Sequence, residues 1–146
     1  MTYKIGPATV RALAALPVYP AFDSLTAAPA FDVSLARSGM LLVTYTQGAA
    51  KGAGTFPRLR MRGGMTATSL FDVTIEDASA PVDLGVGVGL QTKVRTTIKA
   101  FDGADLAVSY PIDLTRWNFM SFQFSEVAGG APAGTLLAQL IIELDH

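Results

Sequence analysis

The sequence predicts an all-β protein, an antiparallel β-sandwich or jelly roll with an extended N-terminal arm. From residue 39 onward apolar residues recur at every second position, which is the period of a strand. Segments rich in glycine and proline separate these runs at regular spacing, and no amphipathic helix pattern is convincing. No linker divides the chain, so we expect an arm over residues 1–36 and a single sandwich domain over residues 37–146.

The composition is unusually apolar for a soluble monomer of 146 residues. Half of the residues are hydrophobic, 16% are charged and the net charge is −1. No run approaches the roughly 18 apolar residues that span a bilayer, so membrane insertion is not expected. We therefore expect apolar surface to be buried between the subunits of a homo-oligomer. The absence of cysteine excludes disulfides and thiolate metal sites.

The arm is interrupted too often by proline to form a long helix or a central strand. Residues 8–16 are compatible with a helical turn at most. Val18, Tyr19 and Phe22 make the arm too apolar for a disordered tail, and we expect it to dock on the protein's own sheet or on a neighbouring subunit. The prolines of the arm are Pro7, Pro17, Pro20 and Pro29.

The first strands of the sandwich are expected at residues 39–47, 56–62 and 69–77. The turn sequence GGMTATS makes the second and third of these plausible hairpin neighbours. In the third strand Phe71, Val73 and Ile75 are expected to face inward and the acidic residues outward.

The last strands are expected at residues 105–114, 117–127 and 134–144. Pro111 is expected to end the first of them. The second carries aromatic residues on both faces, so we expect it to be covered on both sides, by the arm or by another subunit. The turn segment AGGAPA joins it to the third.

Residues 82–100 keep one alternating pattern over a length that exceeds the usual strand. Valines and leucines share the parity expected to fill the core, and Gly85, Gly87 and Gly89 share the other. A bend, bulge or hairpin is expected near the glycines. A phosphate loop would need a helix after the glycines, and strand pattern follows them instead, so nucleotide binding is not expected. The bare glycine face is expected to pack closely against the arm or a neighbouring subunit.

Arg58, Arg60 and Arg62 form a row on one strand face, and they make the strongest charge pattern in the sequence. One interpretation is a basic patch for an acidic partner surface. The other is cross-strand pairing with Asp72 and Glu76 of the neighbouring strand. Aromatic residues do not interleave with these arginines, so nucleic-acid binding is not favoured. Three further basic residues share a strand face: Lys93, Arg95 and Lys99.

No catalytic constellation can be assembled from this sequence. The only histidine is His146, the last residue, where chain ends fray. Asp102 and Asp105 flank a glycine turn but supply too few oxygens for calcium. We therefore predict a non-enzymatic protein without cofactor or metal.

The stretch RWNFMSFQFSEVAGGAPAGTLLAQLIIELD, residues 116–145, resembles the closing hairpin of jelly-roll cement or decoration proteins from the capsids of tailed bacteriophages. This resemblance implies a homotrimer on the outer capsid surface that binds the major capsid protein and stabilises the head lattice. The matching residues are Arg116, Trp117, Gly130, Ala133, Gly134, Thr135 and the aliphatic run that ends at Asp145.

The function expected from the sequence is thus that of a virion structural protein on the capsid surface, made in the host cytoplasm. Two alternatives stay open. One is another phage structural component, in the tail or a head fibre. The other is a carbohydrate-binding β-sandwich that uses Trp117 and Tyr110.

Overall fold

A computed structural model describes residues 2–52, 54–77, 82–83, 90–91, 94–101 and 105–145, and this part of the chain contains strands and no helix. The prediction of an all-β fold is confirmed. The strands are β1 (Thr2–Ala15), β2 (Phe31–Asp32), β3 (Ser38–Thr46), β4 (Phe56–Thr66), β5 (Ser69–Asp72), β6 (Ile75–Asp77), β7 (Val82–Asp83), β8 (Leu90–Gln91), β9 (Val94–Thr96), β10 (Ile98–Ala100), β11 (Leu106–Asp113), β12 (Phe119–Val127) and β13 (Thr135–Asp145).

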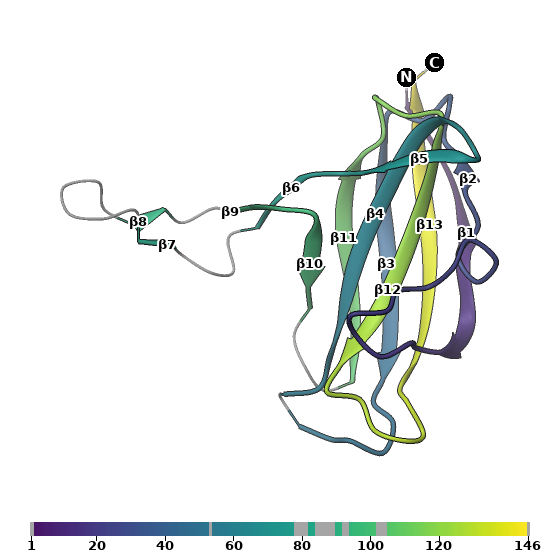
Figure 1. The fold of residues 1–146 in the computed structure, drawn as a ribbon. Helices are drawn as coiled ribbons and strands as arrows, with labels where there is room; N and C mark the ends of the chain where they lie inside the picture. The colour runs from purple at the N-terminus through teal and green to yellow at the C-terminus, as the bar shows by residue number, and fades with distance from the viewer. Residues whose placement is uncertain are drawn as a thin grey trace.

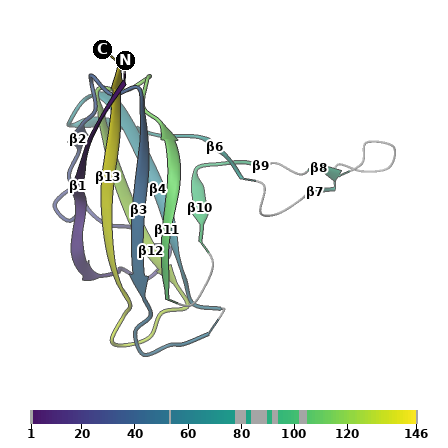
Figure 2. The ribbon, with the colours of Figure 1, turned by 180° about the vertical axis from the view of Figure 1, so that it is seen from behind.

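Two antiparallel sheets pack face to face, and Figures 1 and 2 show the two layers from opposite sides. The first sheet has the order β1-β13-β3-β11, and the second has the order β10-β4-β12-β2 with β5 paired to β4. Successive strands of these two sheets alternate between the layers, except that β4, β5 and β10 all belong to the second sheet. This strand order is that of a jelly roll.

The core lies between the two sheets and follows the alternation of the sequence. Leu41 and Leu140 of the first sheet and Phe122 of the second are completely buried. Each sits two residues from further buried neighbours, because every second side chain of a strand points to the same side. Among the residues that the structure describes, the other completely buried hydrophobic side chains are Ala28, Leu114, Met120, Phe124, Leu136 and Ala138.

Residues 2–15 of the expected arm form strand β1 at the edge of the first sheet, paired with β13. The helical turn considered for residues 8–16 is therefore wrong. Pro7 is tolerated because an edge strand leaves one row of N–H groups without a ladder partner. The pairing is interrupted between Ile5 and Ala8, where Gly6 has a φ of +121° that favours glycine.

The next part of the expected arm lies along the free edge of β12. The Tyr19 N–H donates to the Glu126 carbonyl at 2.9 Å, and the Asp23 N–H donates to the Phe124 carbonyl at 3.1 Å. Further along, β2 pairs with the beginning of β12. The Ser121 hydroxyl, on the outer face of β12, donates to the Ala28 carbonyl at 2.7 Å. The expectation that the arm docks on the protein's own sheet, and that β12 is covered on both faces, is confirmed.

The alternating pattern of residues 82–100 is interrupted, as its unusual length predicts. Their described parts are β7, β8, β9 and β10, and only β10 joins a main sheet, where it pairs with β4. Strand β7 pairs antiparallel with β8, which confirms the expected hairpin. Strand β9 pairs with β6, and these four short strands β6–β9 project from the side of the sandwich (Figure 1). Gly85, Gly87 and Gly89 lie outside the described residues, so their close packing stays a prediction.

Two further strand predictions need correction. The third predicted strand is divided into β5 and β6, and its parity in β5 is reversed, since Leu70 is buried and Phe71 is 64% exposed. The pairing of β4 with β5 shifts register between Gly63, opposite Phe71, and Thr66, opposite Ser69. This shift changes which side of the sheet the side chains of β5 face. Pro111 does not end its strand, because β11 is an edge strand and continues to Asp113.

Candidate functional site

The arginine row lies on the outer face of β4, where the N-terminal segment covers it. The Arg58 guanidinium lies over the Tyr19 ring at 4.5 Å and over the Phe56 ring at 5.6 Å. Such contacts between a cation and an aromatic face are worth about 0.5–1 kcal/mol at exposed sites. The Nε atom of Arg58 is buried without a hydrogen-bond partner in the described chain. The aromatic faces of Tyr19 and Phe56 are thus the main contacts of this cation in the described chain.

Arg60, two residues further along β4, has a similar arrangement. Its guanidinium lies over the Phe22 ring at 4.7 Å. Its Nε and Nη2 atoms both donate to Oε1 of Gln123, at 3.2 and 3.0 Å. Gln123 is on β12, directly opposite Arg60. The two residue sets that the sequence singled out separately, the arginines and the aromatic residues of the arm, therefore meet within one chain.

Arg62 follows the cross-strand alternative that the sequence left open. Its Nε lies 3.5 Å from Oδ1 of Asp72, and Nη2 donates to the Leu70 carbonyl at 3.2 Å. Glu76 does not join this pairing in the backbone register, because it stands opposite Arg95 of β9. Only Asp72 of the two expected acidic partners therefore lies beside the row.

The other predicted binding residues that the structure describes lie in the covering segment, in β9 and in β10. Val18 lies in the covering segment, and its side chain is 54% exposed. The Lys99 ammonium lies 5.6 Å from the centre of the Phe101 ring. Lys93 lies outside the described residues, and only the backbone position of Arg95, in β9, is described. Asp105, weighed above as a calcium ligand, instead accepts a hydrogen bond from the Gln47 N–H at 2.8 Å, and Asp102 lies outside the described residues.

A buried ion pair, which the sequence reasoning missed, joins the two sheets. Arg11 of β1 and Asp23 of the covering segment have side chains that are each 2% exposed. Arg11 also donates from Nη1 to the Leu136 carbonyl at 2.6 Å, and Asp23 accepts from the Phe124 N–H at 2.8 Å. The only available signal was an arginine within the apolar run ATVRALAAL. Its function is structural, because every one of these contacts is internal.

A second buried polar link joins β3 to β12. The Tyr45 hydroxyl donates to Oε2 of Glu126 at 2.6 Å, and the Gly134 N–H donates to the same oxygen at 3.1 Å. Burial, followed by the bond to the Glu126 carboxylate, raises the pKa of the Tyr45 phenol above its ordinary value. A side chain at position 134 would collide with the Glu126 carboxylate, so glycine is required there.

The outer face of the first sheet carries three rows of three uncharged residues, which we call the outer grid. The register places one residue from each of β13, β3 and β11 in every row. On β13 and β3 their strand neighbours are buried in the core, so these residues point away from it, and the residues paired with them on β11 lie on the same face. The rows are Leu137, Thr44 and Ala107; Gln139, Leu42 and Ser109; and Ile141, Met40 and Pro111.

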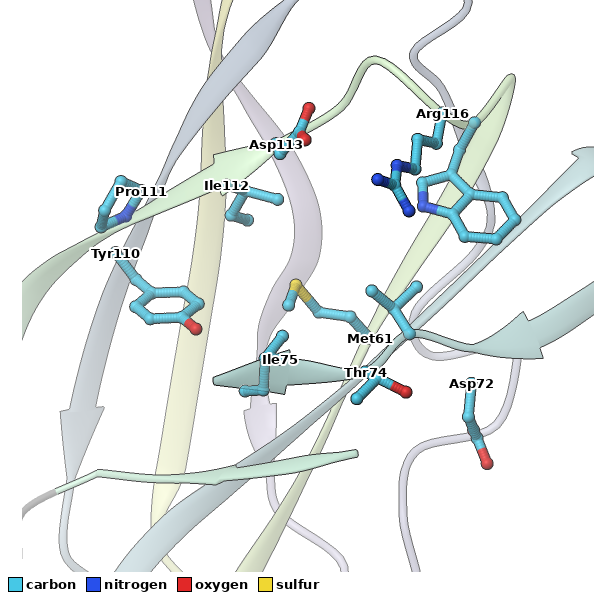
Figure 3. Close-up of a pocket in the computed structure, with 11 residues that line it drawn as sticks. Met61, Asp72, Thr74, Ile75, Tyr110, Pro111, Ile112, Asp113 and Arg116 are labelled. Carbon is cyan, nitrogen blue, oxygen red and sulfur yellow. The ribbon is translucent and has the colours of Figure 1, made fainter. Parts of the chain in front are cut away.

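A cleft of about 460 Å³ opens between the end of β11 and the chain that connects β5 to β6. Met61 and Ile112 form part of its apolar lining (Figure 3). Arg116 and Trp117, which precede β12, form another part, and Tyr110 of β11 contributes an aromatic ring. The sequence predicted a role for Trp117 and Tyr110 together, and the fold brings both to this cleft.

The two acidic residues at the cleft are engaged with groups of their own. Oδ1 of Asp113 accepts from the N–H of Thr115 at 3.0 Å and from its hydroxyl at 2.7 Å. These two bonds, followed by the nearby Arg116 charge, hold the pKa of Asp113 below its usual value. Asp72 is paired with Arg62. Both carboxylates of the cleft therefore already have partners within the chain.

No group of three or more histidine, cysteine or acidic residues that could hold a metal ion occurs in the described ranges. Among the same residues, no helix has the length and apolar character needed to cross a membrane. Comparison of the chain with protein-family models, with curated proteins and with solved structures gave no significant match.

Proposed function

We propose that this protein is a non-enzymatic structural protein of a bacteriophage virion, a cement or decoration protein that binds the major capsid protein and stabilises the head lattice. The observation that carries the proposal is the outer grid. It is an uncharged sheet surface on a sandwich whose opposite face is already covered by its own chain. Uncharged sheet surface of this kind is typical of contacts between proteins.

The mechanism is burial and shape complementarity rather than chemistry. Residues 17–33 and the buried pair Arg11–Asp23 hold the second sheet in one arrangement, so little conformational freedom is lost on assembly. The outer grid is then buried between subunits of a homo-oligomer, a trimer according to the C-terminal resemblance, or against the capsid shell. The location of such a protein is the surface of the virion.

The arginine row contributes less to this contact than its sequence pattern suggests. Arg58 and Arg60 stack on Tyr19 and Phe22, and Arg62 lies beside Asp72. A partner surface would have to compete with these internal contacts. We therefore assign the main assembly contact to the outer grid and a supporting contact to the row.

The test is assembly of the purified protein, alone and with shells of the major capsid protein encoded beside it. Native mass spectrometry gives the subunit number, and electron microscopy of mixed samples shows whether density is added to the shell. The variant Leu42→Glu places a charge in the centre of the grid and should abolish assembly. Leu35→Glu is the matched control, because Leu35 is 82% exposed and lies outside the grid.

A strict monomer that adds no density to shells would overturn the proposal. Equal assembly by the Leu42→Glu and Leu35→Glu proteins would remove the grid from the contact. The triple change of Arg58, Arg60 and Arg62 to serine separates the two surfaces. It should weaken assembly by much less than Leu42→Glu, and full loss of assembly in the folded triple variant would move the contact to the row.

A further inference from the structure

The cleft beside the end of β11 combines one cation with two aromatic side chains. The Arg116 guanidinium and the Tyr110 hydroxyl both point toward its middle (Figure 3). Phe101 holds the Tyr110 ring edge-on at a centroid distance of 6.1 Å. The ring therefore has a fixed position from which its hydroxyl reaches into the cleft.

Of the three charged side chains that line the cleft, the Arg116 guanidinium is the one without a close polar partner in the described chain, and it favours an anion. The carboxylates of Asp72 and Asp113 turn away from its middle (Figure 3), toward the partners described above. Arg116 is exposed and makes no hydrogen bond or ion pair within 4 Å to any residue in the described ranges. Its planar fork of donors fits a carboxylate, which accepts two parallel bonds from one guanidinium.

Trp117 provides a flat apolar surface in the same cleft. Its ring lies against the backbone of Gly63, where a Cβ atom would be only 2.6 Å from the ring carbon Cδ2. The ring is partly exposed, and its indole N–H has no hydrogen-bond partner in the described chain. An aromatic ring that is backed by the sheet and open to a cleft suits the apolar face of a sugar ring, while donors at its edge suit sugar hydroxyls.

An extended peptide fits the cleft less well. Peptides that bind beside a sheet usually add a strand to a free edge, and the edge available here belongs to β11. Pro111 of that strand lines the cleft and has no N–H to donate. The edge is thus protected against strand addition at the point where the cleft lies.

We propose that this cleft binds a carboxylate-bearing saccharide, a sugar of the uronate or sialate class. The sugar ring stacks on Trp117, the carboxylate accepts two hydrogen bonds from Arg116, and the Tyr110 ring forms part of the cleft wall. This activity is separate from the assembly proposed above, because the outer grid and the cleft consist of different residues apart from Pro111 at their border.

The fluorescence of Trp117, the only tryptophan, reports directly on this cleft. The probes are oligogalacturonate and its methyl ester, which differ only in the charged carboxylate, and sialyllactose with lactose as its neutral counterpart. At least one acidic probe should change the fluorescence with a saturable curve, and its neutral counterpart should bind about tenfold or more weakly. The acidic probe that binds identifies the uronate or the sialate class.

Arg116→Gln should weaken binding of the acidic probe by about tenfold or more, while Arg116→Lys should retain part of it. Lys51→Gln is the matched control, since it also removes one positive charge. Lys51 lies in the loop after β3, whereas Asp113 at the cleft pairs with Ser38 at the beginning of β3. Thermal unfolding confirms that each variant is folded. Failure of both acidic saccharides to bind, equal binding by Arg116→Gln, or Arg116-dependent binding of an acidic peptide without saccharide binding would overturn the proposal.

Discussion

Arg11 and Asp23 form a two-point ion pair in the interior, with Nε 2.6 Å from Oδ2 and Nη2 3.0 Å from Oδ1. Arg11 belongs to β1 of the first sheet, and Asp23 is hydrogen-bonded to β12 of the second. The pair therefore joins the two layers at the place where the chain crosses between them. Its charges are compensated on both sides by backbone groups, which is the condition for burying an ion pair.

Removing one partner of this pair should be strongly destabilising. Asp23→Ala leaves the Arg11 guanidinium buried without its anion, and the free energy of unfolding should fall by about 3–5 kcal/mol. Replacing both residues by apolar ones, Arg11→Met with Asp23→Leu, should recover much of this loss. Urea unfolding of the single and double variants measures the coupling. Lys51→Ala is the surface control, with an expected change within about 0.5 kcal/mol.

Tyr45 should make the stability of the protein sensitive to alkaline pH. Its folded-state pKa lies above the unfolded value of about 10, so the folded state holds the phenolic proton more tightly. This contribution to stability is complete below the unfolded pKa and is lost as the pH rises toward the folded pKa. Between about pH 8 and pH 11 the wild type should lose more stability than Tyr45→Phe, in which the other titrating groups are the same. Parallel stability curves would contradict the assignment.

Gly63 should tolerate no side chain, because Trp117 lies against it. The Cβ atom of Gly63→Ala would meet the indole ring at 2.6 Å, so the ring must shift. We expect a loss of about 1–3 kcal/mol in the free energy of unfolding and an altered tryptophan emission maximum. Gly54→Ala serves as the control, since nothing lies within 4 Å of a Cβ atom built at that glycine. An unchanged emission spectrum in Gly63→Ala would refute the contact.

Asp113 should respond to the loss of a single hydroxyl group. Thr115→Ala removes the 2.7 Å bond to its carboxylate but keeps the backbone N–H, so the pKa of Asp113 should rise part of the way to its ordinary value. Titration of the carboxyl carbons by NMR measures this. Asp32 has the same arrangement with Ser34, at 2.9 and 2.7 Å. Ser34→Ala should therefore raise the pKa of Asp32 and leave that of Asp113 unchanged.

The long, strongly alternating segments could be predicted from the sequence. Residues 39–47, 117–127 and 134–144 coincide with β3, β12 and β13 to within two residues. Residues 8–16 could not, because the proline and alanine content of β1 is acceptable only at a sheet edge. Residues 82–100 satisfied strand alternation throughout, yet local alternation does not reveal where a chain leaves one sheet.

The candidate sites show the same division. The arginine row was recognised from its alternate spacing, but the rings that cover Arg58 and Arg60 come from Tyr19 and Phe22, about 40 residues earlier in the chain. Of the residues that line the cleft, the sequence predicts a binding role for Trp117 and Tyr110. Its cation, Arg116, stands out in the sequence only as part of the C-terminal hairpin, because nothing in the local sequence shows that Asp72 and Asp113 turn away from the cleft.

The sequence by itself determined that this is a β protein, which faces of its long strands are apolar, and that the strand over residues 117–127 is covered on both sides. These properties follow from the two-residue period of a strand, which is local. Only the tertiary structure decided what covers that strand, that Arg11 meets Asp23, and that Arg116 shares a cleft with Tyr110. Those contacts join residues far apart in the chain, and they are set by strand order and register, which local periodicity does not encode.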